Sequence, residues 1–585
     1  MEKSVEVVEL VSSLLDGAKY KEVLSVPLDE KYCESFKDNC SDLVSVVVGK
    51  IQDETIVIKP SLYGACEQLL AYIVQKAAPE EALLEFIEQV EIAKNDAQFA
   101  IVLTPLQALL KKLTAKRGRS LEWCLNSVST YIETIPVPEH FLEGKERLLM
   151  DSDPNVRRIS RVYALLPAFY RPFVNELNVP DANKNTKQII TAFLISLLGS
   201  PVIYIDLDPE CNTQGELRQC CGNIIHDICI LENDLIKFFE LLDECCKEKN
   251  KSKSEDTNEE KSPYQHRDKI NLTSLAGLYY IALSGHFPLP DTAIPQVYCI
   301  EYIVHNALLS VIHLLTFTEY GPVSKALHLC KSLITRLPER FSHNFLTLPV
   351  HFNVCKALMN VGIYSTYESL RKFAVSLISS HVNKFEYKGR YAIVKYIIET
   401  ANHSGMIGFA ITLYKNSLNE AFKEQQLHDC FIGTQLFNII KKMCHLPHGV
   451  ESDLVELADQ IITTLNFLRY LSLKDTQNLT GIRNLYPYIE DEYLDKLRTS
   501  LNMSKAHYEV KLKEIEEGKK HGGENVNVSI NIGGNTLDDI PDNNKKEIIY
   551  SALNAFHLIE GLVARLSECI NINKMQNLNM DCDDK

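Results

Sequence analysis

Apolar residues recur along most of this chain at the three- and four-residue spacing of an amphipathic helix. One series begins at Pro79 and ends near Val90, and another runs from Val323 to Leu337 and stops before Pro338. Such segments, roughly 12 to 20 residues long with short polar connections, are typical of stacked helix pairs. We therefore predict an all-α fold, a HEAT/armadillo-like helical repeat array whose repeats are degenerate because no consensus recurs.

Two interruptions shape the predicted array. A polar, mixed-charge run indicates a disordered linker or loop at 246–266, between an N-terminal repeat region at 1–245 and a C-terminal one at 267–572. The second interruption is a Gly/Asn-rich insertion at 518–544, in which apolar and polar residues alternate and predict a small β-hairpin or edge strand. An acidic tail at 573–585 follows the last predicted helix.

The segment 489–515 predicts a helix with two apolar faces. At about 100° per residue, six residues share one stripe: Leu494, Leu497, Leu501, Tyr508, Leu512 and Ile515. The opposite side holds Met503, Ala506 and Val510, with His507 nearby. Two explanations fit the second stripe: the helix is buried between two layers of the stack, or this face recognises another protein.

The composition is that of a folded chain without affinity for polyanions. Of 585 residues, 45% are hydrophobic and 24% charged, which suits two or more cores or one elongated array. The formal net charge of −16 gives no general attraction to phosphate backbones or anionic bilayers. We therefore expect neither nucleic acid nor a membrane as a partner.

No secretory or membrane-spanning segment is predicted. Residues 1–6 begin acidic and lack a basic region followed by an apolar one. The most apolar window, 189–205, is interrupted by Gly199 and Pro201. Seventeen scattered cysteines, an odd number, fit reduced thiols better than a disulfide framework, so we expect a cytoplasmic protein.

The sequence contains none of the common nucleotide-binding, zinc-protease or hydrolase motifs. The nearest approach to a metal site is a group of thiols with one imidazole: Cys211, Cys220, Cys221, His226 and Cys229. Thiolate and imidazole ligands suit zinc, but this spacing has no paired Cys-x-x-Cys and isoleucines surround it. Buried packing is favoured, and we expect no catalytic residue, metal or cofactor; a metal or thiol enzyme is the third hypothesis.

Four short sequence motifs in the C-terminal third are distinctive: Asn402-His-Ser-Gly405, Leu465-Asn-Phe-Leu-Arg-Tyr-Leu471, Asn478-Leu-Thr-Gly481 and Leu501-Asn-Met-Ser-Lys-Ala-His-Tyr-Glu509. Together with a fainter match at Ile135-Pro-Val-Pro138, they resemble the glomulin family of all-helical proteins with HEAT-like repeats. Outside this third, the resemblance consists of chain length, helical content and a few short matching segments.

The resemblance implies a non-catalytic binding protein. In that family, the C-terminal repeats cover the RING subunit of cullin-RING ubiquitin ligases and hide the surface that recruits the ubiquitin-conjugating enzyme. An immunophilin is a second partner linked to the family. The expected partner-binding residues are Arg469, Tyr470, Asn502, Met503, Lys505 and His507. The alternative is a general HEAT-type scaffold or adaptor for another protein.

Several of these residues have competing explanations. Met503 offers a flexible apolar contact among polar neighbours, as at many interfaces. Lys505 lies nearer the first apolar stripe and is included on family likeness alone. Arg469 and Tyr470 are residue types enriched among interface anchors, but salt bridging and packing between repeats explain them equally well.

Overall fold

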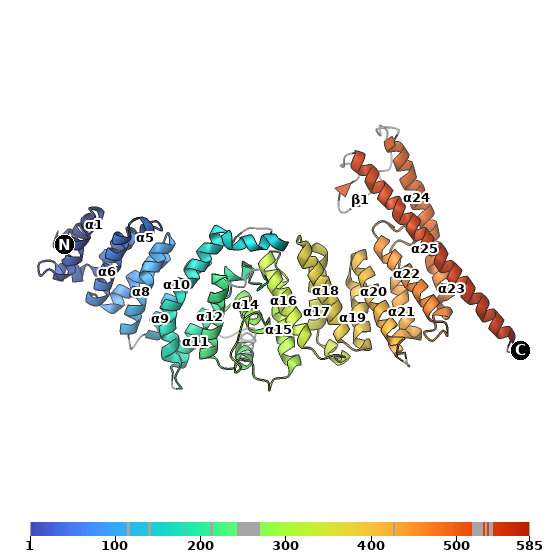
Figure 1. Ribbon diagram of the computed structural model, residues 1–585, viewed down its shortest axis with the longest axis horizontal. Coiled ribbons are helices and arrows are strands. Elements are labelled where there is room, and N and C mark those ends of the chain that lie inside the picture. Colours follow the sequence, from blue (N-terminus) through green and yellow to red (C-terminus); the bar gives the residue numbers. More distant parts are fainter. Residues whose placement is uncertain are drawn as a thin grey trace, which may run out of the picture. The chain divides into compact units, whose positions relative to one another are not determined.

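The described part of the chain is built almost entirely from helices (Figure 1). The computed structural model describes residues 2–113, 117–138, 142–180, 182–210, 215–242, 270–424, 427–516, 531–532, 535–536 and 542–583. Two short strands, β1 (Asn531–Ile532) and β2 (Asn535–Thr536), pair antiparallel inside the Gly/Asn-rich insertion. The predicted all-α helical array is confirmed. None of the described helices is both long and apolar enough to cross a membrane.

The chain forms two compact units. The first comprises residues 1–336 with 366–370, and the second comprises 337–365 with 371–585. The linker predicted at 246–266 lies outside the described residues, so it stays a prediction.

Helices of the first unit follow one another along the chain: α1 (Glu2–Asp16), α2 (Tyr20–Ser25), α3 (Cys33–Asp38), α4 (Cys40–Gly49), α5 (Thr55–Ile58), α6 (Pro60–Lys76), α7 (Pro79–Glu91), α8 (Asp96–Lys112), α9 (Arg117–Glu133), α10 (Pro154–Leu177), α11 (Lys184–Ser196), α12 (Glu216–Leu231), α14 (Leu272–Leu283), α15 (Ile300–Leu314) and α16 (Tyr320–Arg336). The 3₁₀ turns η1 (Val26–Leu28), η2 (Gly144–Ser152) and η3 (Val202–Tyr204) lie between them. Near neighbours pack together, as α7 does with α8 and α10 with α12.

The apolar spacing of the sequence accounts for these helices. Pro79 is the first residue of α7, where its missing N–H costs no hydrogen bond, and Leu83 and Val90 are buried in this helix, which packs against α8. The series from Val323 forms α16, which ends just before Pro338. Both predicted helices are confirmed.

The second unit contains α17 (Val350–Tyr364), α18 (Glu368–Lys384), α19 (Tyr387–Thr400), α20 (Ser404–Ala421), α21 (Gly433–Met443), α22 (Ala458–Lys474), α23 (Tyr486–Tyr488), α24 (Asp495–Glu516) and α25 (Asp542–Asp583). The first residues of α18 belong to the first unit. Short helical turns are η5 (His343–Thr347), η6 (Asp429–Phe431), η7 (Gly449–Glu451), η8 (Ile482–Leu485) and the π-helical η9 (Ile489–Leu494). In order, α19 packs on α20, α20 on α22, and α22 on α25.

Helix ends in this unit differ from the predicted ones for local reasons. The apolar spacing predicts one helix from Asp453 to Leu471, but α22 begins only at Ala458, because the Asp453 carboxylate accepts the N–H groups of Val455 and Glu456 and holds a turn there. The helix expected over 489–515 opens with the wider π turn η9 before α24. The apolar spacing predicts a last helix over 545–570, but α25 continues to Asp583 and so includes most of the predicted acidic tail at 573–585.

Candidate protein-binding surface

Helix α24, which carries four of the predicted binding residues, lies antiparallel to α25 (Figure 1). Its buried side includes Leu501 and Tyr508, and the Tyr508 ring stands edge-on to the Phe556 ring of α25, with centroids 5.3 Å apart. At the start of α24, Arg498 donates a hydrogen bond to the Ser567 hydroxyl, further along α25. The first apolar stripe of α24 is therefore the face that fixes this helix in the fold.

The second stripe of α24 is open. Met503 is 53% exposed and Val510 is 56% exposed, and Ala506 between them is also exposed. The helical angle places Asn502 on one flank of this stripe and His507 on the other, and both are exposed. Among the described residues, α24 is thus not buried between two layers, and none of them covers its outer face. We call the surface of Asn502, Met503, Ala506, His507 and Val510 the α24 face.

The His507 side chain packs against its neighbour on α24. Its ring stands edge-on to the Tyr508 ring, with centroids 5.9 Å apart. Partial burial, with the nearby Lys511 ammonium, lowers the pKa of His507 below its ordinary value. At neutral pH the imidazole is uncharged, so it offers a partner one hydrogen-bond donor and one acceptor.

Lys505 does not belong to the open face. Its ammonium forms an ion pair with the Glu560 carboxylate of α25, and only 14% of the lysine side chain is exposed. This pairing holds the pKa of Glu560 below its ordinary value. Because the charge of Lys505 is already engaged between α24 and α25, the residue serves this helix pair directly.

Arg469 and Tyr470 lie on α22 and are both half-buried. The Tyr470 hydroxyl donates to Asn419 Oδ1 on α20 at 2.9 Å, and Lys415 Nζ lies 5.9 Å from the Tyr470 ring centroid. Arg469 Nε is buried and makes no hydrogen bond to any residue that the structure describes. For Tyr470 these contacts favour packing between repeats, the second of the two explanations left open by the sequence.

The cysteine group of the sequence forms part of the core of the first unit. Cys220, Cys221 and Cys229 are buried in α12, whereas His226 is exposed on the same helix. Burial raises the pKa of Cys221 to about 12 and that of Cys229 to about 11, so these thiols stay protonated at neutral pH. Cys211 lies outside the described residues. The described thiols pack among apolar side chains, as the surrounding isoleucines indicated.

Sequence reasoning missed a cluster in the first unit: Asp208, His286 and His328, whose ligand atoms lie within 4.8 Å of one another. Arg147 Nη2 donates to Asp208 Oδ2 at 3.0 Å, and burial lowers the pKa of His328 to about 4. Because the guanidinium already neutralises the carboxylate and would repel a metal cation, this geometry favours a polar packing network. The members are far apart in the sequence, so local spacing gave no signal for the cluster.

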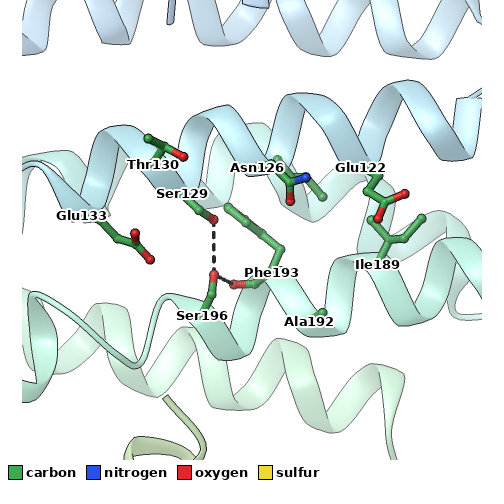
Figure 2. A pocket seen from close by; sticks show the side chains of 10 residues that line it. Glu122, Asn126, Ser129, Thr130, Glu133, Ile189, Ala192, Phe193 and Ser196 are labelled. Carbon is green, nitrogen blue, oxygen red and sulfur yellow. Dashed lines mark hydrogen bonds between the residues drawn. The ribbon is translucent and has the colours of Figure 1, made fainter. Parts of the chain in front are cut away.

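A hollow of about 350 Å³ lies between α9 and α11 (Figure 2). The Ser129 and Ser196 hydroxyls face each other across it at 3.2 Å, and Ser196 Oγ donates to the Phe193 carbonyl at 2.7 Å. Among its described lining residues there is no histidine or lysine that would serve as a base for either serine. The arrangement favours a polar contact between two helices over nucleophilic chemistry.

The described residues define an all-α helical-repeat protein with an exposed apolar stripe on α24, near its C-terminal end. Residues 296–547 match the model of a family described as "Uncharacterised protein family, YAP/Alf4/glomulin". Glomulin from Homo sapiens is 27% identical over 512 residues, covering 86% of this chain and 82% of its own. Glomulin from Mus musculus is 26% identical over 575 residues, covering 95% and 92%. The chain is therefore similar to glomulin over most of its length, and the α24 face falls within the segment that the family model matches.

Proposed function

We propose that this protein is a non-catalytic binding protein that acts in the cytoplasm by masking the RING subunit of cullin-RING ubiquitin ligases. By covering that subunit, it blocks recruitment of the ubiquitin-conjugating enzyme. Similarity to glomulin supports the broader role of a protein-binding adaptor. An immunophilin is proposed as a second partner on family likeness alone.

One observation supports the masking role above the others: the exposed stripe of Met503 and Val510 on a helix that is otherwise well anchored. An apolar centre with hydrogen-bonding groups at its edge, here Asn502 and His507, is the usual anatomy of a protein interface. Because α24 is held by α25 on its opposite side, little ordering is needed on binding, which favours affinity.

Masking requires only affinity and shape. An interface of about 1,600 Å² with a few buried anchors is sufficient for a stable complex. Met503 is the proposed central anchor, since a flexible thioether adapts to an irregular partner surface. Lys505 is proposed to act indirectly, by holding α24 against Glu560 of α25. Arg469 and Tyr470 remain proposed contacts of α22.

The test is ubiquitin transfer by a purified cullin-RING ligase in the presence of increasing amounts of the full chain. We expect transfer to fall as the protein saturates the RING subunit, and we expect Met503→Asp with His507→Ala to relieve this inhibition. Tyr364→Asp is a matched control, because Tyr364 is also a strongly exposed side chain of the second unit but lies on α17. Unchanged transfer at saturating wild-type protein contradicts the proposal.

A further inference from the structure

The second unit contains a groove that the masking role does not use. It has a volume of about 680 Å³, within the range of ligand sites, and α19 forms its floor. The groove side of α19 presents Lys388, Tyr391, Lys395 and Glu399, which recur at three- and four-residue spacing and so share one face. Its walls come from η5, α17, η6 and the start of α21.

Contacts among the lining side chains hold the aromatic part of this groove in place. The Phe352 and Tyr396 rings pack against each other with centroids 4.9 Å apart. The Tyr391 hydroxyl donates to the Gln435 carbonyl at 3.2 Å, which ties α19 to α21. A rigid aromatic surface of this kind loses little entropy when an extended chain lies on it.

The charges of the groove favour an anionic occupant. Lys388 and Lys395 make no ion pair with any residue that the structure describes, although the whole chain carries a net charge of −16. The Glu399 carboxylate is engaged by Lys442 at 2.7 Å, and Glu386 is engaged by His343. Asp429, with no ion pair among the described residues, is the remaining acidic lining group, so two unpaired ammonium groups face one unpaired carboxylate.

The spacing of the two lysines matches an extended peptide. Lys388 and Lys395 are seven residues apart on α19, or about 10.5 Å along the axis at 1.5 Å per residue. A peptide in the extended polyproline II conformation has three residues per turn and rises about 3.1 Å per residue, so side chains three positions apart lie on the same side, about 9 Å from each other. An acidic residue at each of these two positions would meet one of the two ammonium groups.

We propose that this groove binds an extended acidic peptide of a partner protein, with acidic residues at positions i and i+3. Two lysines are too few to hold a polynucleotide backbone, which is bound by many cations at once. The inference concerns α19 and does not rest on the masking role assigned to α24.

The test is selection of a random nonapeptide display library on the full chain and, in parallel, on Lys388→Glu with Lys395→Glu. We expect the wild-type protein to enrich peptides with the spaced acidic pair and the double variant to lose them. Lys423→Glu with Lys474→Glu is the matched control, since it makes the same charge change at exposed sites of the unit away from the groove. It should enrich the same peptides as the wild type.

A synthetic peptide of the enriched sequence gives the quantitative readout. We expect its dissociation constant to rise at least tenfold on the double variant, and also when Asn and Gln replace its acidic residues. Enrichment of neutral or basic peptides, or equal affinity for the wild type and the double variant, contradicts the proposal. The double variant should still inhibit ubiquitin transfer, which separates a failure here from a failure of the masking role.

Discussion

The buried histidine His381 predicts a specific loss of stability in mild acid. It lies in α18 of the second unit, fully buried, and neither ring nitrogen has a hydrogen-bond partner among the described residues. Its ring stacks on His351 with centroids 5.3 Å apart and meets the edge of Phe385 at 5.4 Å. Burial, reinforced by His351, lowers the pKa of His381 to about 3 from an ordinary value of 6.5.

The sign of the effect follows from proton linkage. Between about pH 3 and pH 6.5 the unfolded chain binds a proton at His381 and the folded chain does not. The stability that the neutral His381 contributes is therefore fully present above pH 6.5 and is lost progressively as the pH falls toward the folded-state pKa of His381. The slope approaches about 1.4 kcal/mol per pH unit, so His381 alone removes about 1 kcal/mol between pH 6 and pH 5.

The assay is urea denaturation of wild type and His381→Leu at several pH values between 7.5 and 5, followed by far-UV circular dichroism. Leucine removes the titrating group at similar volume, so the variant should lack this share of the pH dependence. His445→Leu, at an exposed histidine of the same unit, should behave as the wild type. Trp123, the sole tryptophan, reports the first unit by fluorescence, and its transition should not respond to His381→Leu.

The pH profiles decide whether the reasoning is right. Parallel curves for wild type and His381→Leu between pH 6.5 and pH 5 would refute it, because they would mean that the folded protein takes up the proton as readily as the unfolded chain. A variant that is less stable by the same amount at every pH would show a packing role without linkage.

The ion pair between Lys505 and Glu560 predicts that Lys505→Ala lowers the unfolding free energy by about 1 kcal/mol or less and weakens RING binding far less than Met503→Asp, as measured by urea denaturation and by titration. Tyr470→Phe should cost about 1 kcal/mol of stability by losing its hydrogen bond to α20; an unchanged urea midpoint would argue that the hydroxyl is dispensable for packing. At pH 8 the exposed Cys299 should react with a thiol reagent within minutes while Cys221 reacts only after unfolding, and equal rates by mass spectrometry would contradict the burial of α12.

The helices and the α24 face were predictable because both depend on local periodicity. Apolar spacing alone predicts α7 and α16, and the helical angle alone places Met503 opposite the anchored stripe. The choice between burial and exposure of that stripe required the structure, since periodicity does not say what covers a face. The predicted position of a helix end was wrong where a single side chain sets the boundary, as the Asp453 carboxylate does before α22.

The contacts that the sequence did not predict join residues far apart in the chain. The partners Lys505 and Glu560 come from different helices, and no helical angle reveals such a pair. The stacking of His351 on His381 is equally invisible, because an isolated buried histidine carries no signal of its neighbour. The groove on α19 also depends on walls from four other elements, so its two lysines look like ordinary surface charges in the sequence.

The most direct test of the central claim, that the α24 face docks on the RING subunit, is a titration of that purified subunit against wild type and Met503→Asp. Loss of a central anchor costs about 2 kcal/mol or more, so we predict at least a roughly 30-fold rise in the dissociation constant. The urea midpoint should stay nearly unchanged, since Met503 is an exposed side chain. Equal affinity of the two proteins, or no binding by the wild type, would contradict the claim.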